Sequence, residues 1–113
     1  MKKALFFIFF AGAFIVSMAT AQEYPTIRIV NNTGYVGYYL YVSQTAVAEW
    51  EEDLLEEDIL PDGGTIAVRL GQPLSEANRY DIQLEDEDGD TYTKWNVLIT
   101  PNALIEFTLD DLD

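Results

Sequence analysis

The segment from Arg79 to Ile99, RYDIQLEDEDGDTYTKWNVLI, constrains the fold more than any other part of the sequence. Two runs in which apolar and polar residues alternate flank Asp88-Gly89. This dipeptide favours the two-residue type I′ hairpin turn, because both central residues take positive φ there. A turn at this position predicts the following cross-strand pairs: Glu87 with Asp90, Leu84 with Thr93, Ile82 with Trp95, and Tyr80 with Val97.

This register sorts the hairpin into two faces of different character. The predicted inner face is apolar: Tyr80, Ile82, Leu84, Trp95, Val97 and Ile99. The predicted outer face is mostly polar, with one exception in Leu98: Arg79, Asp81, Gln83, Glu85, Tyr92, Lys94 and Asn96. A slip of one residue would mix the two faces, so the pattern specifies the pairing.

The first residues have the composition of a secretory signal peptide. Lys2 and Lys3 precede an apolar run over 4–16, and alanine stands at the −3 and −1 positions before Gln22. This pattern predicts a signal peptide over 1–21 that is cleaved after Ala21. The apolar run is shorter than the ~20 residues of a membrane-spanning helix, so we expect no membrane insertion after cleavage. The expected product is one secreted or periplasmic domain over 22–113.

The charge of that domain limits its partners. All 20 acidic residues of the chain lie in 22–113, with only four basic residues: Arg28, Arg69, Arg79 and Lys94. The resulting net charge of −16 repels phosphate backbones and anionic lipid surfaces, so we expect neither nucleic acid nor membrane as a partner. The absence of cysteine excludes disulfides.

Further strands are predicted on both sides of the hairpin. β-Branched and aromatic residues are concentrated in four runs bounded by turn signals: 26–31, 35–43, 65–70 and 104–109. The run at 35–43 is apolar or aromatic on both faces, which leaves open whether it is covered on both sides or displays tyrosines to solvent.

Two segments differ from this strand pattern. Ala46, Trp50 and Leu54 recur every fourth residue, which predicts one short helical turn around 46–55, although acidic residues near its end make the helix marginal. The final residues 110–113 are expected to fray. Together these patterns predict an all-β fold, a small antiparallel β-sandwich of about 6–7 strands and of immunoglobulin-like size. A small barrel is the alternative.

Catalysis is not expected. The sequence has no histidine and no cysteine, so the usual neutral-pH base, thiolate nucleophile and zinc ligands are missing. A carboxylate pair could in principle hydrolyse a glycoside, but a domain this small leaves little room for a substrate cleft. The chain is therefore expected not to be an enzyme, and no cofactor is expected apart from weakly bound Ca²⁺.

The calcium hypothesis rests on the tip of the predicted hairpin. Asp86, Asp88 and Asp90 have the alternating spacing that calcium loops often use. The match to an EF-hand fails, because Thr91 replaces the invariant glycine and Val97 replaces the closing glutamate. We therefore expect weak binding, in the millimolar class of extracellular modules, or a solvated acidic turn without metal.

The second candidate site consists of tyrosines. Tyr35, Tyr39 and Tyr41 lie on one face of the predicted strand over 35–43. An exposed aromatic strip can stack on sugar rings or anchor a protein partner, because tyrosine combines apolar area with a polar tip. Tyrosine is also an ordinary strand residue, so packing alone is the alternative explanation.

Several motifs together resemble a known group of proteins. These motifs are NNTGYVGYYLYVS, ILPDGG, RYDIQLEDEDGDTYTKWNVLI and the final LDDLD. Their combination resembles a group of small, uncharacterised exported β-domain proteins found in spirochaetes and other bacteria, and it covers nearly all of 22–113. The motifs are turn and strand signatures, so the resemblance implies a shared fold and transfers no functional residues.

The leading functional hypothesis is a non-enzymatic, secreted or periplasmic binding or assembly module of the cell envelope, with an unidentified protein or glycan partner or with further copies of itself. The alternatives are a carbohydrate-binding module that uses the Tyr-rich strand and a weak Ca²⁺-binding module at the 85–90 acidic hairpin tip.

Overall fold

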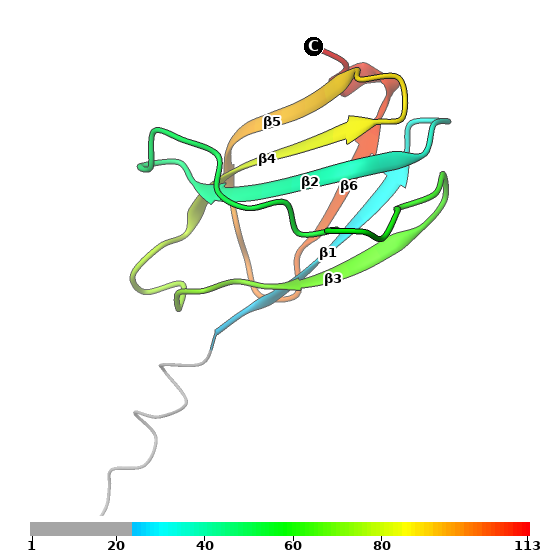
Figure 1. The fold of residues 1–113 in the computed structure, drawn as a ribbon. Coiled ribbons are helices and arrows are strands. Elements are labelled where there is room, and N and C mark those ends of the chain that lie inside the picture. Colours follow the sequence, from blue (N-terminus) through cyan, green and yellow to red (C-terminus); the bar gives the residue numbers. More distant parts are fainter. Residues whose placement is uncertain (1–23) are drawn as a thin grey trace, which may run out of the picture.

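The computed structural model describes residues 24–113, which form six β-strands in two three-stranded sheets (Figure 1). The strands are β1 (Thr26–Asn32), β2 (Gly37–Gln44), β3 (Thr65–Arg69), β4 (Arg79–Asp86), β5 (Thr91–Leu98) and β6 (Leu104–Thr108). One sheet has the order β3-β1-β6 and the other the order β2-β4-β5. The predicted all-β sandwich is confirmed, and the predicted signal peptide over 1–21 lies outside the described residues.

The first sheet contains a parallel pair. β1 pairs with β3 in antiparallel orientation and with β6 in parallel orientation, so that Ile29 lies between Ile66 and Ile105. The prediction of an entirely antiparallel sandwich is therefore wrong for this pair. Antiparallel pairing is required only where a short turn joins two strands. All the other strands lie between β1 and β6 along the chain, so the connection leaves their relative direction free.

The two sheets enclose one apolar core. Alternation along β4 buries Tyr80, Ile82 and Leu84, and alternation along β1 buries Ile27 and Ile29. Residues from both sheets and from the connections complete the core: Leu40, Leu55, Leu60, Val68, Leu70, Tyr92, Ile99, Ile105 and Phe107. Strands β1, β4 and β6 thus contribute every second residue to the core, as the alternation of side chains along a strand requires.

The connection over 45–64 covers the free edge of β2. Leu54 donates its backbone N–H to the carbonyl of Leu40 at 2.8 Å, and Gly37 and Leu60 exchange backbone hydrogen bonds of 2.8 and 2.9 Å. Leu55 and Leu60 are buried from the same connection. The backbone groups of β2 at these positions are therefore not free to pair with a strand of another chain.

The helical turn predicted around 46–55 is wrong. The segment consists of turns and bends, and the backbone N–H groups of Val47, Glu51 and Leu54 bond to β2. Glu51 donates its N–H to the Ser43 hydroxyl, while the Asp53 carboxylate accepts the N–H of Leu40. These contacts with the strand edge, together with acidic residues that oppose a helix dipole, outweigh the fourfold apolar spacing.

The C-terminal residues are ordered by the edge of β5, so the prediction of a frayed tail is also wrong. A 3₁₀ helix, η3 (Leu109–Asp111), begins with a capping box in which Thr108 and Asp111 bond reciprocally. Leu112 then forms a bridge with Tyr92, and Asp113 donates its N–H to the Thr91 carbonyl at 2.9 Å. This segment covers part of the β5 edge in the way that the 45–64 connection covers β2.

Candidate functional site

The turn between β4 and β5 differs from the predicted one. Gly89 has a positive φ of 84°, whereas Asp88 does not, which excludes the type I′ turn. Gly89 donates its N–H to the Asp86 carbonyl at 3.0 Å, and Asp86 donates its N–H to the Asp90 carbonyl at 2.9 Å. This is a three-residue connection over 87–89, a type I turn followed by glycine in the left-handed conformation.

The longer turn shifts the register by one residue near the tip. Leu84 pairs with Tyr92 and Ile82 pairs with Lys94, so the predicted partners Thr93 and Trp95 are wrong. The predicted pair of Tyr80 with Val97 is confirmed. A second irregularity, opposite Asp81, restores the predicted register at this pair. β5 has one more residue there than β4, and Asn96 takes a positive φ of 54°.

The register shift near the tip exchanges the expected positions of two aromatic residues. Tyr92, expected outside, is 1% exposed, and Trp95, expected in the core, is 64% exposed. Lys94 also turns toward the other sheet: its ammonium lies 5.6 Å from the centre of the Phe107 ring and 3.0 Å from the Asp111 carboxylate. The predicted inner face is therefore wrong for Trp95 and correct for Tyr80, Ile82, Leu84 and Ile99.

Asp86 does not act as an open metal ligand in this arrangement. Its side chain is buried, and Oδ1 accepts the N–H groups of Asp88 and Asp90 at 2.9 and 3.0 Å, while Oδ2 accepts the Tyr92 hydroxyl at 2.8 Å. Within residues 24–113, no three acidic side chains gather in a way that could hold a metal ion. The structure thus places Asp86 inside the turn and leaves Asp88 and Asp90 exposed around it.

Three aromatic rings adjoin one another on the outer side of the β2-β4-β5 sheet. The ring centres of Tyr41 and Trp50 are 6.0 Å apart, and those of Trp50 and Trp95 are 5.7 Å apart. Both distances fall in the range of favourable aromatic contacts. We refer to Tyr41, Trp50 and Trp95 as the aromatic ledge. It joins strand β2 and the following 45–64 connection to strand β5, which is distant from both in sequence.

Backbone contacts fix the position of each tryptophan. The bond from Glu51 N–H to the Ser43 hydroxyl, 3.1 Å, holds the connection next to Trp50 against β2. The Asp81 carboxylate accepts the N–H of Asn96 at 2.8 Å, directly after Trp95, and also accepts the Thr45 hydroxyl at 2.9 Å. The ledge is therefore supported by the sheet and does not depend on a free loop.

The ledge has hydrogen-bonding groups beside it. Gln83 and Thr93 pair across the same face next to Tyr41, with a 2.9 Å bond between their side chains. Asp81 and Glu85, also on β4, add carboxylates to the face. Burial raises the pKa of Tyr41, and the nearby Asp53 carboxylate adds to this effect, so its hydroxyl stays protonated at neutral pH.

The structure keeps Tyr39 and Tyr41 on one face of β2 and places Tyr35 before the strand. Tyr41 belongs to the ledge, and Tyr39 lies on the same strand opposite Glu85, with 41% of its surface exposed. Tyr35 precedes β2, is 43% exposed, and takes part in neither of the two aromatic pairs found in the described residues. Two of the three predicted tyrosines thus lie on one face of β2, and Tyr35 and Tyr39 are displayed to solvent.

Sequence reasoning missed Trp50 and Trp95 as site residues. It assigned Trp95 to the core through the assumed type I′ turn and used Trp50 to dock a helix. A signal for the correct turn was present, since aspartate is favoured at the first position of a type I turn and glycine at the fourth. Asp86 and Gly89 occupy these positions.

Comparisons with known proteins support the fold alone. No protein-family model matches the sequence, and no curated protein matches it. Among solved structures, the chain is similar to the NMR structure of a protein from Eubacterium rectale, with 15% identity and a TM-score of 0.55 over 76% of this chain and 85% of that one. At this identity the similarity indicates a shared architecture and carries no function.

The described residues contain no helix that is long and apolar enough to span a membrane.

Proposed function

We propose that this protein is a non-enzymatic binding module of the cell envelope that binds a neutral polysaccharide on the aromatic ledge. The observation that carries the proposal is the exposure of Trp95, 64%, beside Trp50 and Tyr41 on a rigid sheet. A large aromatic side chain left this exposed contributes little to folding. It is suited to a partner that covers the ring, because burying an indole supplies much of the energy at a binding site.

The arrangement of the rings favours a sugar chain. Successive ring planes differ by 39° and 35°, so the ledge follows a twist rather than a flat surface. The apolar faces of pyranose rings can lie on such rings, while Gln83, Asp81 and Glu85 offer amide and carboxylate groups to hydroxyls at the edge. A site of this kind combines apolar contact with a few polar groups that fix orientation.

The charge of the chain restricts the polysaccharide to neutral classes. The full sequence has a net charge of −14, and the ledge itself is bordered by Asp81 and Glu85. Polymers that carry uronate or phosphate groups would be repelled at moderate ionic strength. We therefore expect uncharged glycans to bind and acidic glycans to bind weakly.

The expected location is consistent with this function. The signal-peptide pattern over 1–21 and the resemblance to small exported β-domain proteins support a place outside the cytoplasm, where envelope polysaccharides occur. The absence of histidine and cysteine from the sequence supports a binding role over a catalytic one.

The proposal is tested by sedimentation with a panel of insoluble neutral polysaccharides, using the wild-type protein, Trp95→Ala and Leu104→Ala. Leu104 is a matched control because it is also exposed, 58%, but belongs to the other sheet. We expect at least one polysaccharide to retain the wild type and Leu104→Ala and to release Trp95→Ala. Retention of all three proteins, or of none on any polysaccharide, would argue against the proposal. If the wild type binds to none of the polysaccharides but co-sediments with a protein fraction of the cell envelope, the partner would be a protein.

A further inference from the structure

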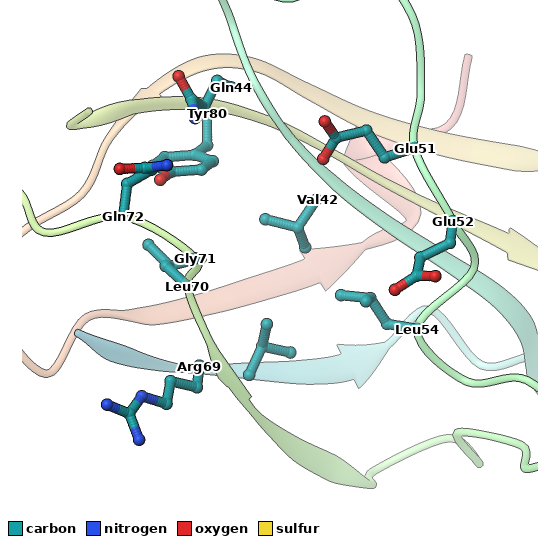
Figure 2. A pocket seen from close by; sticks show the side chains of 11 residues that line it. Val42, Gln44, Glu51, Glu52, Leu54, Arg69, Leu70, Gly71, Gln72 and Tyr80 are labelled. Carbon is teal, nitrogen blue, oxygen red and sulfur yellow. The ribbon is translucent and has the colours of Figure 1, made fainter. Parts of the chain in front are cut away.

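A cavity of about 350 Å³ lies between the two sheets, near the ends of β2 and β3 (Figure 2). Its apolar wall is formed by Val42, Leu54 and Leu70, from β2, the 45–64 connection and the residue after β3. Its volume is in the range of small-molecule sites in proteins, about 300–1,000 Å³. The cavity is separate from the aromatic ledge, since none of the three ledge residues lines it.

Tyr80, whose hydroxyl is an unsatisfied polar group, borders this cavity. Tyr80 lines the cavity and is only 4% exposed, yet its hydroxyl oxygen is buried and has no hydrogen-bond partner among residues 24–113. Leaving such a group unpaired costs about 1–3 kcal/mol, and buried hydroxyls without partners are uncommon. The side-chain amides of Gln44 and Gln72 lie on the same side of the cavity as Tyr80 (Figure 2).

Negative charge lines the opposite side. Figure 2 shows the Glu51 and Glu52 side chains across the cavity from Tyr80, while the Arg69 guanidinium points away from the cavity. Neither glutamate forms an ion pair within residues 24–113. Burial raises the pKa of Tyr80, and the charge of Glu51 adds to this effect.

We propose that this cavity binds an aliphatic diamine or polyamine. One ammonium group lies at the carboxylates of Glu51 and Glu52, the hydrocarbon chain lies against Val42, Leu54 and Leu70, and the second ammonium donates a hydrogen bond to the Tyr80 hydroxyl. Two cationic ends separated by methylene groups match a cavity that has negative charge on one side, an unsatisfied oxygen on the other and an apolar wall between them. The inference rests on this cavity alone and does not depend on polysaccharide binding at the ledge.

The test compares three probes of equal chain length: 1,5-diaminopentane, pentylamine and 1,5-pentanediol. Binding is followed by NMR shifts of the Tyr80 ring resonances in the whole protein, at a fixed ionic strength near 150 mM. The diamine should bind saturably and about tenfold more tightly than pentylamine, because pentylamine has an ammonium group at only one end. The diol should bind most weakly, since it carries no charge for the glutamates.

Three variants test which residues bind the two ammonium groups of the diamine. Glu51→Gln should weaken the diamine by about fivefold or more, whereas Glu57→Gln, an exposed residue of the same connection outside the cavity, should not. Tyr80→Phe keeps the ring and removes the hydroxyl. In this variant the diamine should lose most of its advantage over pentylamine.

Three results would overturn the inference. The first is the absence of saturable shifts at Tyr80 with the diamine. The second is equal weakening by Glu51→Gln and Glu57→Gln, which would indicate general attraction to an acidic protein. The third is a Tyr80→Phe variant that melts higher and binds the diamine as tightly as the wild type, which would show a hydroxyl that no ligand uses.

Discussion

The Tyr92 hydroxyl donates a hydrogen bond of 2.8 Å to Oδ2 of Asp86, and both side chains are buried. Through Oδ1 the same carboxylate accepts two backbone N–H groups of the turn. The bond therefore links the core of the sandwich to the geometry of the hairpin tip. It exists only because the three-residue turn places Tyr92, rather than Thr93, opposite Leu84.

Removing this hydroxyl should destabilise the fold. Tyr92→Phe leaves one oxygen of a buried carboxylate without its donor, so we expect the free energy of unfolding to fall by about 1.5–3 kcal/mol. Tyr38→Phe is the matched control, since Tyr38 is 42% exposed, and it should change stability by less than about 0.5 kcal/mol. Urea denaturation measures both. Equal stability of the two variants would contradict the account of the turn.

The same bond predicts a loss of stability in alkaline solution. Burial, followed by the hydrogen bond to Asp86, raises the pKa of Tyr92 to about 12 from its ordinary value of 10. A folded-state pKa above the unfolded one contributes stability that is complete below pH 10 and is lost as the pH rises toward 12. The free energy of unfolding should fall over this interval, and it should fall less in Tyr92→Phe. A fall of the same size in both proteins would be evidence against this assignment.

Gly37 should not tolerate a side chain. A Cβ atom at this position would lie 2.7 Å from Cδ1 of Leu84 and 3.3 Å from the carbonyl oxygen of Leu60. Both neighbours are buried, so Gly37→Ala should cost about 1–3 kcal/mol of stability through overpacking. Gly71→Ala is the control, because a Cβ there meets no atom within 4 Å, and its stability should stay within about 0.5 kcal/mol of the wild type. Thermal melting compares the two.

Calcium should stabilise the protein only through its ionic strength, without binding to a specific site. Both oxygens of Asp86 already accept hydrogen bonds from protein donors, so of the three predicted ligands only Asp88 and Asp90 are left to an ion at the tip. The melting temperatures in CaCl₂ and in NaCl of the same ionic strength should therefore agree, since screening of the acidic surface is common to both. A larger rise in CaCl₂ that disappears in Asp88→Asn would restore the calcium hypothesis.

Strands β1, β3 and β6 could be predicted because inward and outward residues alternate along each of them. The alternation in 26–31, 65–70 and 104–109 gave strands that match β1, β3 and β6 within one residue at each end. The inner positions Ile27, Ile29, Ile105 and Phe107 are buried. Pairing direction could not be predicted in the same way, because alternation is identical in parallel and antiparallel strands.

The hairpin register was only partly accessible from sequence. Asp88-Gly89 is compatible with both a two-residue and a three-residue turn, and the choice moves every residue of β5 to the other face. The irregularity opposite Asp81 then cancels the shift, so Tyr80 still pairs with Val97. Nothing in the alternation marks Asn96 as the residue with positive φ, although asparagine tolerates that conformation better than most residues.

The candidate site depended on those same details. Trp95 reaches the surface because the three-residue turn places it opposite Asp81, on the outer face of the sheet. Trp50 reaches Tyr41 because the 45–64 connection bonds to the edge of β2 instead of forming a helix. Both positions depend on contacts between segments rather than on the pattern within one segment, so local patterns could identify Tyr41 as a candidate and could not bring the tryptophans to it.

The most direct test of the proposed function is tryptophan fluorescence during titration with a neutral polysaccharide. Trp50 and Trp95 are the only two tryptophans of the sequence, and both belong to the aromatic ledge, so the whole signal reports on the proposed site. We predict a saturable change in intensity and emission wavelength for the wild type, and its loss in a folded Trp95→Ala variant. An unchanged spectrum with every neutral polysaccharide, or an equal affinity in Trp95→Ala, would contradict the proposal.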